Sequence, residues 1–211
     1  MISSETAAVA RARSDNQATV QSYERSADEY AQTTHGPPSP AHGHLFETFI
    51  RRVGAGGRVV EIGSGPGWDA DRLEAAGIDV LRTDVTQAFI ELQRKRGKRV
   101  ERLDLISDDL DGQHDGILCL YVLQHIARPL VPRVLEKIAR ALRQGGFLLI
   151  GLRQGGEDVY EDRASSDGYH VTVWPAKAFL DQLAEVGLIA EDTYVFVGKD
   201  GEWLTLLARR E

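Results

Sequence analysis

Glycines recur at every second position in one short segment of the chain. Residues 61–69 have the sequence Glu-Ile-Gly-Ser-Gly-Pro-Gly-Trp-Asp and directly follow a β-branched run. Because glycine has no side chain to cover its backbone N–H groups, a ligand can approach the chain closely there. A helix that starts near Gly67 would point its positive end into the same space. The segment predicts a nucleotide-type cradle, with a purely structural turn as the alternative.

The spacing separates this turn from two other glycine-rich loops. A dinucleotide-binding fingerprint needs a third glycine, for close helix packing, where Trp68 stands. A phosphate-binding P-loop needs a lysine soon after its glycines, and none follows here. A nicotinamide oxidoreductase is therefore the weaker interpretation.

Two acids follow at the ends of the next two predicted strands. Asp84 ends the second strand, about twenty residues past the turn, where a carboxylate can accept hydrogen bonds from ribose hydroxyls. Asp104 ends the third strand and is followed by Leu105, next to where a purine would lie. Ligands of open α/β sheets bind at the carboxyl ends of the strands. We therefore expect the turn and both acids to share one site, although each acid could also be a solvated residue.

The elements that position these residues alternate between strands and helices. Apolar or β-branched runs predict strands at residues 58–62, 78–83, 100–103, 116–120, 146–152, 193–197 and 203–208. Helical patterns between the first five predict parallel βαβ units. Asp200-Gly201 between the last two runs is a hairpin signal, so the last strand should be antiparallel. The fold class is α/β, a doubly wound, Rossmann-like, seven-stranded sheet.

Before the first strand, the pattern predicts two helices that cap the sheet. Residues 1–13 are expected to be loosely ordered, with Ser14 as a helix cap. The prolines of residues 36–40 separate the two helices within residues 14–53. We expect one domain over residues 14–211, because no repeat or second core is evident.

Composition excludes several functions. The net charge of −7 argues against nucleic-acid binding, and the basic run 94–99 suits a helix C-terminus. No apolar stretch is long enough to cross a membrane, and the N-terminus lacks an apolar signal region. The single cysteine, Cys119, lies in an apolar run and fits a reducing cytosol, so we predict a cytoplasmic protein. His35, His42 and His44 cluster near the prolines without completing a metal site, so no metal is expected.

Five segments in order resemble the motifs of class I S-adenosylmethionine (SAM)-dependent methyltransferases, of the small-molecule, type 11/12-like kind. These segments are residues 61–67, 82–86, 103–105, 115–126 and 138–146, and the resemblance spans about residues 20–210. It implies SAM as cofactor and S-adenosylhomocysteine as product. One departure is Gln144, where the family commonly has a proline.

The resemblance also implies how the cofactor is held. Glu61 would fix the turn near the methionine amine, Asp84 would bind the ribose, and Asp104 would contact the adenine amine. Residues 23–30 are similar to the family's N-terminal cap helix. The implied cofactor-binding residues are Tyr30, Glu61, Gly63, Ser64, Gly65, Gly67, Asp84, Val85, Asp104, Leu105 and Tyr121.

Methyl transfer from a sulfonium is an in-line displacement that mainly needs alignment, with a base when the acceptor is a hydroxyl. His125, after the fourth strand, and His170 are the candidate catalytic residues, each with a structural role as the alternative. His170 lies in a substrate-roof insertion expected over residues 153–174. Acids at positions 157, 158, 161 and 162 would favour an amine acceptor if that segment covers the site.

The predicted function is methyl transfer from SAM to the oxygen or nitrogen of a small molecule. Two alternatives remain from the residues alone: a SAM-binding protein that transfers no methyl group, because one fold hosts many functions, and a methyltransferase acting on a peptide or protein group.

Overall fold

The computed structural model describes residues 4–35, 40–163 and 166–211, and seven described strands form one sheet. These strands are β1 (Arg58–Ile62), β2 (Asp79–Asp84), β3 (Val100–Arg102), β4 (His114–Leu120), β5 (Leu142–Gln154), β8 (Leu188–Gly198) and β9 (Gly201–Arg210). Their order across the sheet is β3-β2-β1-β4-β5-β9-β8. The first five pair in parallel, whereas β9 is antiparallel to both β5 and β8. The predicted fold class and antiparallel last strand are confirmed.

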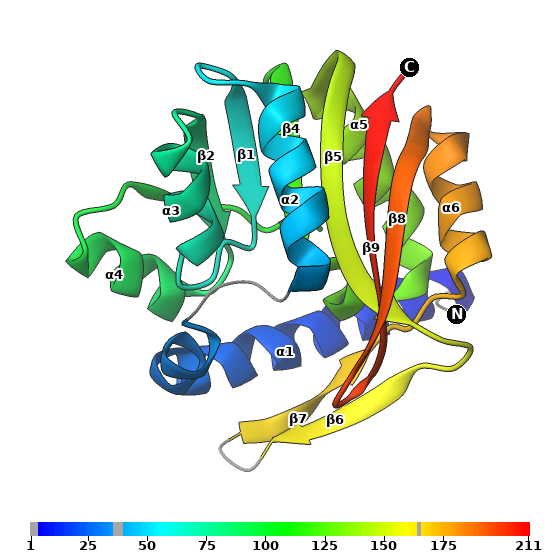
Figure 1. Cartoon of the computed structure of the whole chain (residues 1–211). Coiled ribbons are helices and arrows are strands. Elements are labelled where there is room, and N and C mark those ends of the chain that lie inside the picture. Colours follow the sequence, from blue (N-terminus) through cyan, green and yellow to red (C-terminus); the bar gives the residue numbers. More distant parts are fainter. Residues whose placement is uncertain (1–3, 36–39, 164–165) are drawn as a thin grey trace.

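Helices cover both faces of this sheet (Figure 1). The helices are α1 (Ser4–Thr34), α2 (Pro40–Val53), α3 (Trp68–Ala75), α4 (Gln87–Lys95), α5 (Val131–Ala141) and α6 (Ala176–Glu185). Successive residues of a strand point to opposite faces. Val59 belongs to the apolar cluster of α2 and α3, while Val60 belongs to the cluster of α5 and α6. The central strands are therefore buried on both sides, as their apolar sequences predict.

The first helix starts earlier than predicted. α1 begins at Ser4 and continues through Ser14, so residues 4–13 are helical rather than loosely ordered, and Ser14 is not a helix cap. Alanines occupy positions 7, 8, 10 and 12 of this stretch, and alanine has the highest helix propensity, which explains the correction. Figure 1 shows α1 crossing the carboxyl ends of the strands. It therefore covers the edge where the predicted site residues lie.

A hairpin follows β5 within the predicted insertion. β6 (Val159–Arg163) and β7 (Ser166–Val171) form a separate two-stranded sheet, on the side of α1 away from the main sheet (Figure 1). The Thr172 amide donates to the Gln124 carbonyl at 2.8 Å, which ties the end of the hairpin to the loop after β4. The sequence predicted an insertion over residues 153–174 but no hairpin within it, because acids interrupt the apolar alternation there.

Candidate functional site

The glycine turn after β1 has the backbone that its sequence predicts. Gly63, Gly65 and Gly67 have φ angles of 66°, 52° and 83°, a region that residues with a side chain rarely adopt. A Cβ on Gly63 would lie 2.4 Å from Val122 Cγ2, whereas at Gly65 the nearest atom would be 4.0 Å away, on the ring of Tyr30. An added Cβ at Gly65 would therefore have no close neighbour, and α3 begins shortly afterwards at Trp68.

A buried side-chain network supports the turn from beneath. Gln93 of α4 donates to Ser64 Oγ at 2.6 Å and to the Gly65 carbonyl at 2.8 Å. The Arg82 guanidinium donates to Gln93 Oε1 at 3.0 Å and to the Gly67 carbonyl at 3.2 Å. A Cβ on Gly67 would lie 2.4 Å from Gln93 Oε1. Gly67 therefore lets this network approach the turn and does not line the cleft described below.

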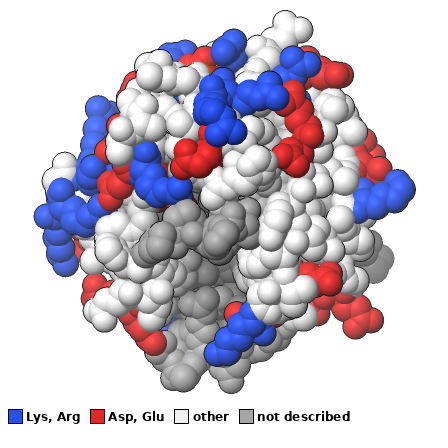
Figure 2. Space-filling view, viewed as in Figure 1, with Lys and Arg blue, Asp and Glu red and all other residues white. Residues whose placement is uncertain are grey.

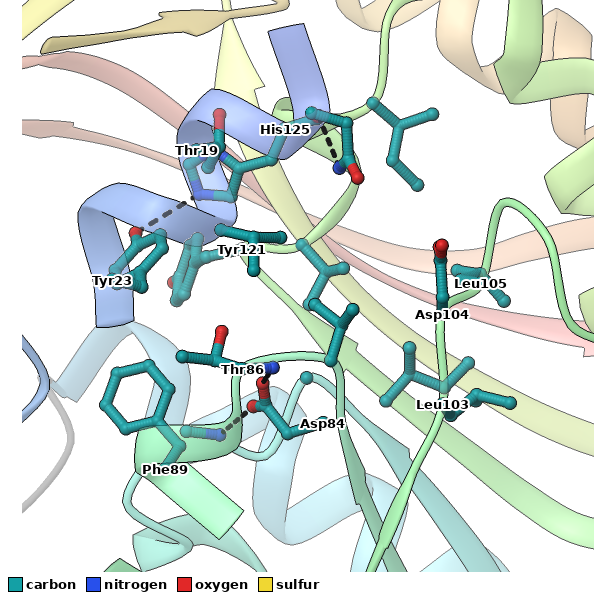
Figure 3. A pocket seen from close by; sticks show the side chains of 18 of the residues that line it. Thr19, Tyr23, Asp84, Thr86, Phe89, Leu103, Asp104, Leu105, Tyr121 and His125 are labelled. Atoms are coloured by element: carbon teal, nitrogen blue, oxygen red, sulfur yellow. Dashed lines mark hydrogen bonds between the residues drawn. The ribbon is translucent and has the colours of Figure 1, made fainter. Parts of the chain in front are cut away.

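Asp84 lies at the end of β2, beside the turn, and is buried (Figure 3). Its Oδ2 accepts from the Gly65 amide and its Oδ1 from the Thr86 amide, both at 2.7 Å. Burial raises the pKa of Asp84, and these amide hydrogen bonds oppose the shift. Asp84 thus shapes the turn as well as facing the cleft.

A cleft opens along the carboxyl edge of the sheet, and one part of it, here named the Asp84 half, contains Asp84 and Asp104. Figure 3 shows the two acids on different segments, with apolar Leu103 and Leu105 beside Asp104. The Asp104 carboxylate accepts from the Ile106 amide and from Ser107 Oγ, each at 3.0 Å, so it also orders its own loop. Predicted residues that line this half are Tyr30, Gly63, Gly65, Asp84, Val85, Asp104, Leu105, Tyr121 and His125.

The Glu61 half lies on the other side of the turn. It is lined by Glu61 and Ser64 of the predicted set, together with Trp68, Asp69 and Arg72. Glu61 is buried, and among the described residues its Oε2 has no hydrogen-bond partner. Burial, followed by the negative charge of Asp69, raises the pKa of Glu61 well above its ordinary value, while Arg82 acts in the opposite direction. A buried carboxylate oxygen without a donor favours a cationic or N–H-bearing ligand here.

Tyr121 lies where the two halves meet and lines both of them. Its φ angle of 61° is the only positive one among the described residues other than glycine. The Tyr121 amide donates to the Gly151 carbonyl at 2.8 Å, and its ring meets Trp203 edge-on at 5.0 Å. Strained backbones of this kind are held by their surroundings and are common at functional sites.

The structure separates the two candidate histidines. His125 lines the Asp84 half, where its Nε2 lies 3.2 Å from the hydroxyl oxygen of Tyr23. His170 lies on β7 with its Nε2 3.5 Å from Asp158 Oδ2, and it lines neither half. Asp158 also accepts from Arg128 and from the Val173 amide. His170 and Asp158 therefore belong to a cluster outside the cleft.

Several lining residues were not predicted from the sequence. From α1 come Asn16, Thr19 and Tyr23, and from α4 comes Phe89, all in the Asp84 half. The resemblance placed residues 23–30 in a helix that caps the cofactor, but it named only Tyr30 of that helix as a binding residue. No described side chain of the 153–174 insertion lines either half, so its predicted roof role has no support from those side chains.

The structural interpretations of two other features, the basic run and Cys119, are confirmed. The basic run ends α4, and its members pair with Asp71, Glu74 and Glu101; Figure 2 shows basic and acidic side chains mixed in this region. Cys119 is buried, and burial raises the pKa of its thiol. Within the described part of the chain, no three metal-ligating residues gather; His35 packs on Trp68, His44 faces Asp192, and the His42 side chain lies outside the described residues.

Among the described helices, none is both long and apolar enough to cross a bilayer.

Comparison with known proteins points to one family. A family model described as a methyltransferase domain matches residues 60–148. The ubiquinone biosynthesis O-methyltransferase of Xanthomonas oryzae is 25% identical over 127 residues, covering 54% of this chain and 52% of that protein. The match thus spans about half the length of that curated relative.

Two solved structures share the fold. The 1,6-didemethyltoxoflavin-N1-methyltransferase of Burkholderia thailandensis, with S-adenosylhomocysteine bound, aligns with a TM-score of 0.69 at 19% identity, over 92% of this chain and 86% of that one. The [4+2]-cyclase SpnF aligns with a TM-score of 0.66 at 17% identity, over 91% and 94%. At such identities the likeness concerns the fold. The matched methyltransferase domain and the shared fold make this chain similar to the class I SAM-dependent methyltransferases.

Proposed function

We propose that this protein transfers a methyl group from SAM to a small-molecule acceptor. The observation that carries the proposal is the two-part cleft around the glycine turn after β1. The carboxyl groups of Asp84 and Asp104 line one half of the cleft, and that of Glu61 lines the other. On this proposal the Asp84 half would hold the adenosine and the Glu61 half the methionine, joined through one sulfur. The comparisons support it through the relatives named as methyltransferases.

The residues present fit that cofactor. The buried Glu61 Oε2, which has no donor within the described structure, would accept from the methionine ammonium. The open face of Gly65 would admit the ligand against the backbone. The Asp84 carboxylate accepts amide hydrogen bonds from Gly65 and Thr86, and it would also accept from a ribose hydroxyl.

Asp104 and Leu105 would hold the adenine. Asp104 presents carboxylate oxygens as acceptors for the exocyclic amine, and Leu105 offers an apolar wall. On this assignment Tyr121, at the junction of the halves, lies beside the sulfur and the methyl group. Gly67 keeps only the supporting role described above.

When bound, SAM supplies a methyl group that is already activated by the positive sulfur. The protein's residues need to align an acceptor in line with that methyl, exclude water and, for a hydroxyl acceptor, take up a proton. His125 is the candidate for proton uptake because it lines the cleft, whereas His170 is paired with Asp158 outside it.

The acceptor is proposed to be a small molecule methylated on oxygen or nitrogen. Of the two similar proteins named as methyltransferases, one methylates oxygen by its name, as an O-methyltransferase, and the other is an N1-methyltransferase. The amine preference predicted from the acids of the insertion loses support at Asp158, whose charge is matched by Arg128 at 3.0 Å.

The alternative is a SAM-binding protein that transfers no methyl group. It is favoured by one observation: a [4+2]-cyclase has the same fold.

Titration calorimetry of the full chain with SAM and S-adenosylhomocysteine tests the proposal. We expect both to bind and NADH not to bind. Asp104→Asn should weaken binding by about tenfold, because it exchanges a charged acceptor for a neutral one. Mass spectrometry should detect S-adenosylhomocysteine only when an acceptor is added. A folded protein that binds neither compound contradicts the proposal, and binding without methyl transfer to any acceptor favours the alternative.

A further inference from the structure

A tyrosine from the first helix reaches the histidine that follows β4. The Tyr23 hydroxyl oxygen lies 3.2 Å from His125 Nε2, although the residues are 102 positions apart in the sequence. Both side chains line the Asp84 half of the cleft. Figure 3 shows the pair beside Tyr121, at the end of the pocket away from Asp104.

The histidine is held on several sides. Its ring meets Tyr23 edge-on at 5.5 Å and Tyr169 of β7 at 5.1 Å between centroids. Tyr169 also stacks on Tyr23 at 5.8 Å, and only 2% of its surface is exposed. The Asn16 side chain donates to the His125 carbonyl at 3.3 Å. The β6–β7 hairpin and α1 thus fix the pair together.

This arrangement limits how a ligand can exchange a proton with His125. An imidazole nitrogen has one position for a hydrogen bond, either as donor or as acceptor. Tyr23 occupies that position at Nε2, and Nδ1 is buried. A group bound in the cleft therefore reaches the imidazole through the Tyr23 hydroxyl rather than directly.

We propose that Tyr23 relays a proton from a hydroxyl acceptor to His125, so that the acceptor is an alcohol or a phenol. This inference rests on the proposed function. As the acceptor oxygen bonds to the methyl carbon, the carbon–sulfur bond breaks and its electron pair stays on sulfur. The acceptor's proton moves to Tyr23 Oη while the Tyr23 proton moves to His125 Nε2. The imidazolium later releases its proton to water.

The relay requires one particular state of the histidine. Nε2 must be unprotonated, accepting from Tyr23, with the proton of the neutral ring on Nδ1. An amine acceptor needs no such path, because it must only arrive deprotonated. The relay therefore serves a hydroxyl acceptor, and an amine acceptor would not use it.

Nitrogen-15 NMR of the full chain labelled at histidine, with S-adenosylhomocysteine added, tests this state. The His125 signal is assigned from its loss in His125→Asn. We expect the Nδ1–H form in the wild type and a shifted Nε2 signal in Tyr23→Phe, which removes only the hydroxyl. Tyr194→Phe, on β8, is the matched control and should leave the signal unchanged. The Nε2–H form in the wild type, or no shift in Tyr23→Phe, overturns the relay.

Turnover provides the second readout, with catechol and aniline as probes and S-adenosylhomocysteine as the measured product. In Tyr23→Phe, kcat for catechol should fall by about 100-fold with little change in KM, the size expected for loss of acid–base catalysis. Any turnover of aniline should be the same in Tyr23→Phe as in the wild type, because an amine acceptor does not use the relay. A protein that binds SAM yet methylates no hydroxyl probe contradicts the hydroxyl acceptor. Failure to bind SAM at all would instead contradict the proposed function.

Discussion

Gln93 donates a hydrogen bond from its side-chain nitrogen to the carbonyl oxygen of Gly65, at 2.8 Å. Gln93 is completely buried on α4, and it also accepts from Arg82 at 3.0 Å. The conformation of the ligand-facing turn therefore depends on a helix that follows the next strand. Such a buried polar network is stable only while every member is satisfied.

Replacing Gln93 by leucine should weaken both the fold and cofactor binding. Gln93→Leu keeps the volume roughly but leaves the Gly65 carbonyl and an Arg82 N–H without partners. We expect the free energy of unfolding to fall by about 1–3 kcal/mol, and the Kd for SAM to rise by about tenfold as the turn loosens. Urea unfolding and calorimetry measure the two effects. Gln182→Leu, on the partly exposed surface of α6, is the control; equal effects in both variants would contradict the role given to Gln93.

Glu61 should bind the cofactor at the expense of stability. Burial, with help from Asp69, raises the pKa of Glu61, so the folded state holds the proton more tightly than the unfolded state. This tighter proton binding stabilises the folded state fully at pH values below the pKa of Glu61 in the unfolded chain. The stabilisation is lost as pH rises through the higher pKa of Glu61 in the folded state. Glu61→Gln should therefore have a higher Tm than the wild type at pH values above the pKa of Glu61 in the folded state. The difference in Tm should shrink as pH falls.

The same Glu61→Gln variant should bind SAM more weakly, by about tenfold, because the ammonium loses a charged acceptor. Thermal unfolding from pH 4 to 8 and calorimetry at pH 8 test both parts. Glu185→Gln on α6 serves as the control. A variant that is destabilised at pH 8, or that binds SAM as the wild type does, would contradict this account of Glu61.

A side chain at Gly65 should block the cleft without unfolding the protein. Gly65→Ala places a methyl group at a φ of 52°, which costs about 1–2 kcal/mol in backbone strain. Gly54→Ala is a matched control, because Gly54 has a φ of 78° and no neighbour within 4 Å of an added Cβ. Both variants should lose similar stability in urea unfolding, but only Gly65→Ala should lose SAM affinity, by at least about tenfold. Equal SAM affinity in the two would show that the open face of Gly65 is not where the ligand lies.

Glu24 should control how firmly α1 covers the cleft. Its carboxylate accepts from the Gln87 amide at 2.6 Å and from the Ala88 amide at 2.9 Å, at the N-terminus of α4. Glu24→Gln removes a charge from the positive end of that helix, a loss of about 0.3–1 kcal/mol. Limited proteolysis should cut α1 several-fold faster, and bound S-adenosylhomocysteine should restore protection. Asp28→Asn, also exposed on α1, should be cut at the wild-type rate; faster cutting there would assign the effect to charge alone.

Most of the fold was predictable because its signals are local. The apolar runs of the strands, the alternating helices and the Asp200-Gly201 turn each depend on neighbouring residues, and each is confirmed. The start of α1 was misplaced because a cap at Ser14 is a weaker signal than an alanine-rich stretch before it. The β6–β7 hairpin was missed because its acids hide the strand pattern, and its partner is α1 rather than the main sheet.

The sequence alone determined that the glycine turn and the acids share one cleft, since glycines at 63 and 65 and acids at strand ends must meet at one edge of a parallel sheet. Only the tertiary structure decided which histidine faces that edge. His125 and His170 are equivalent as residue types, but Tyr23 meets the first and Asp158 the second. The tertiary structure likewise shows that Gly67 packs against Gln93 and Arg82 beneath the turn and does not line the cleft. Such contacts join residues far apart in the chain, so they depend on how α1 crosses the sheet and how the hairpin packs on it, which no local pattern encodes.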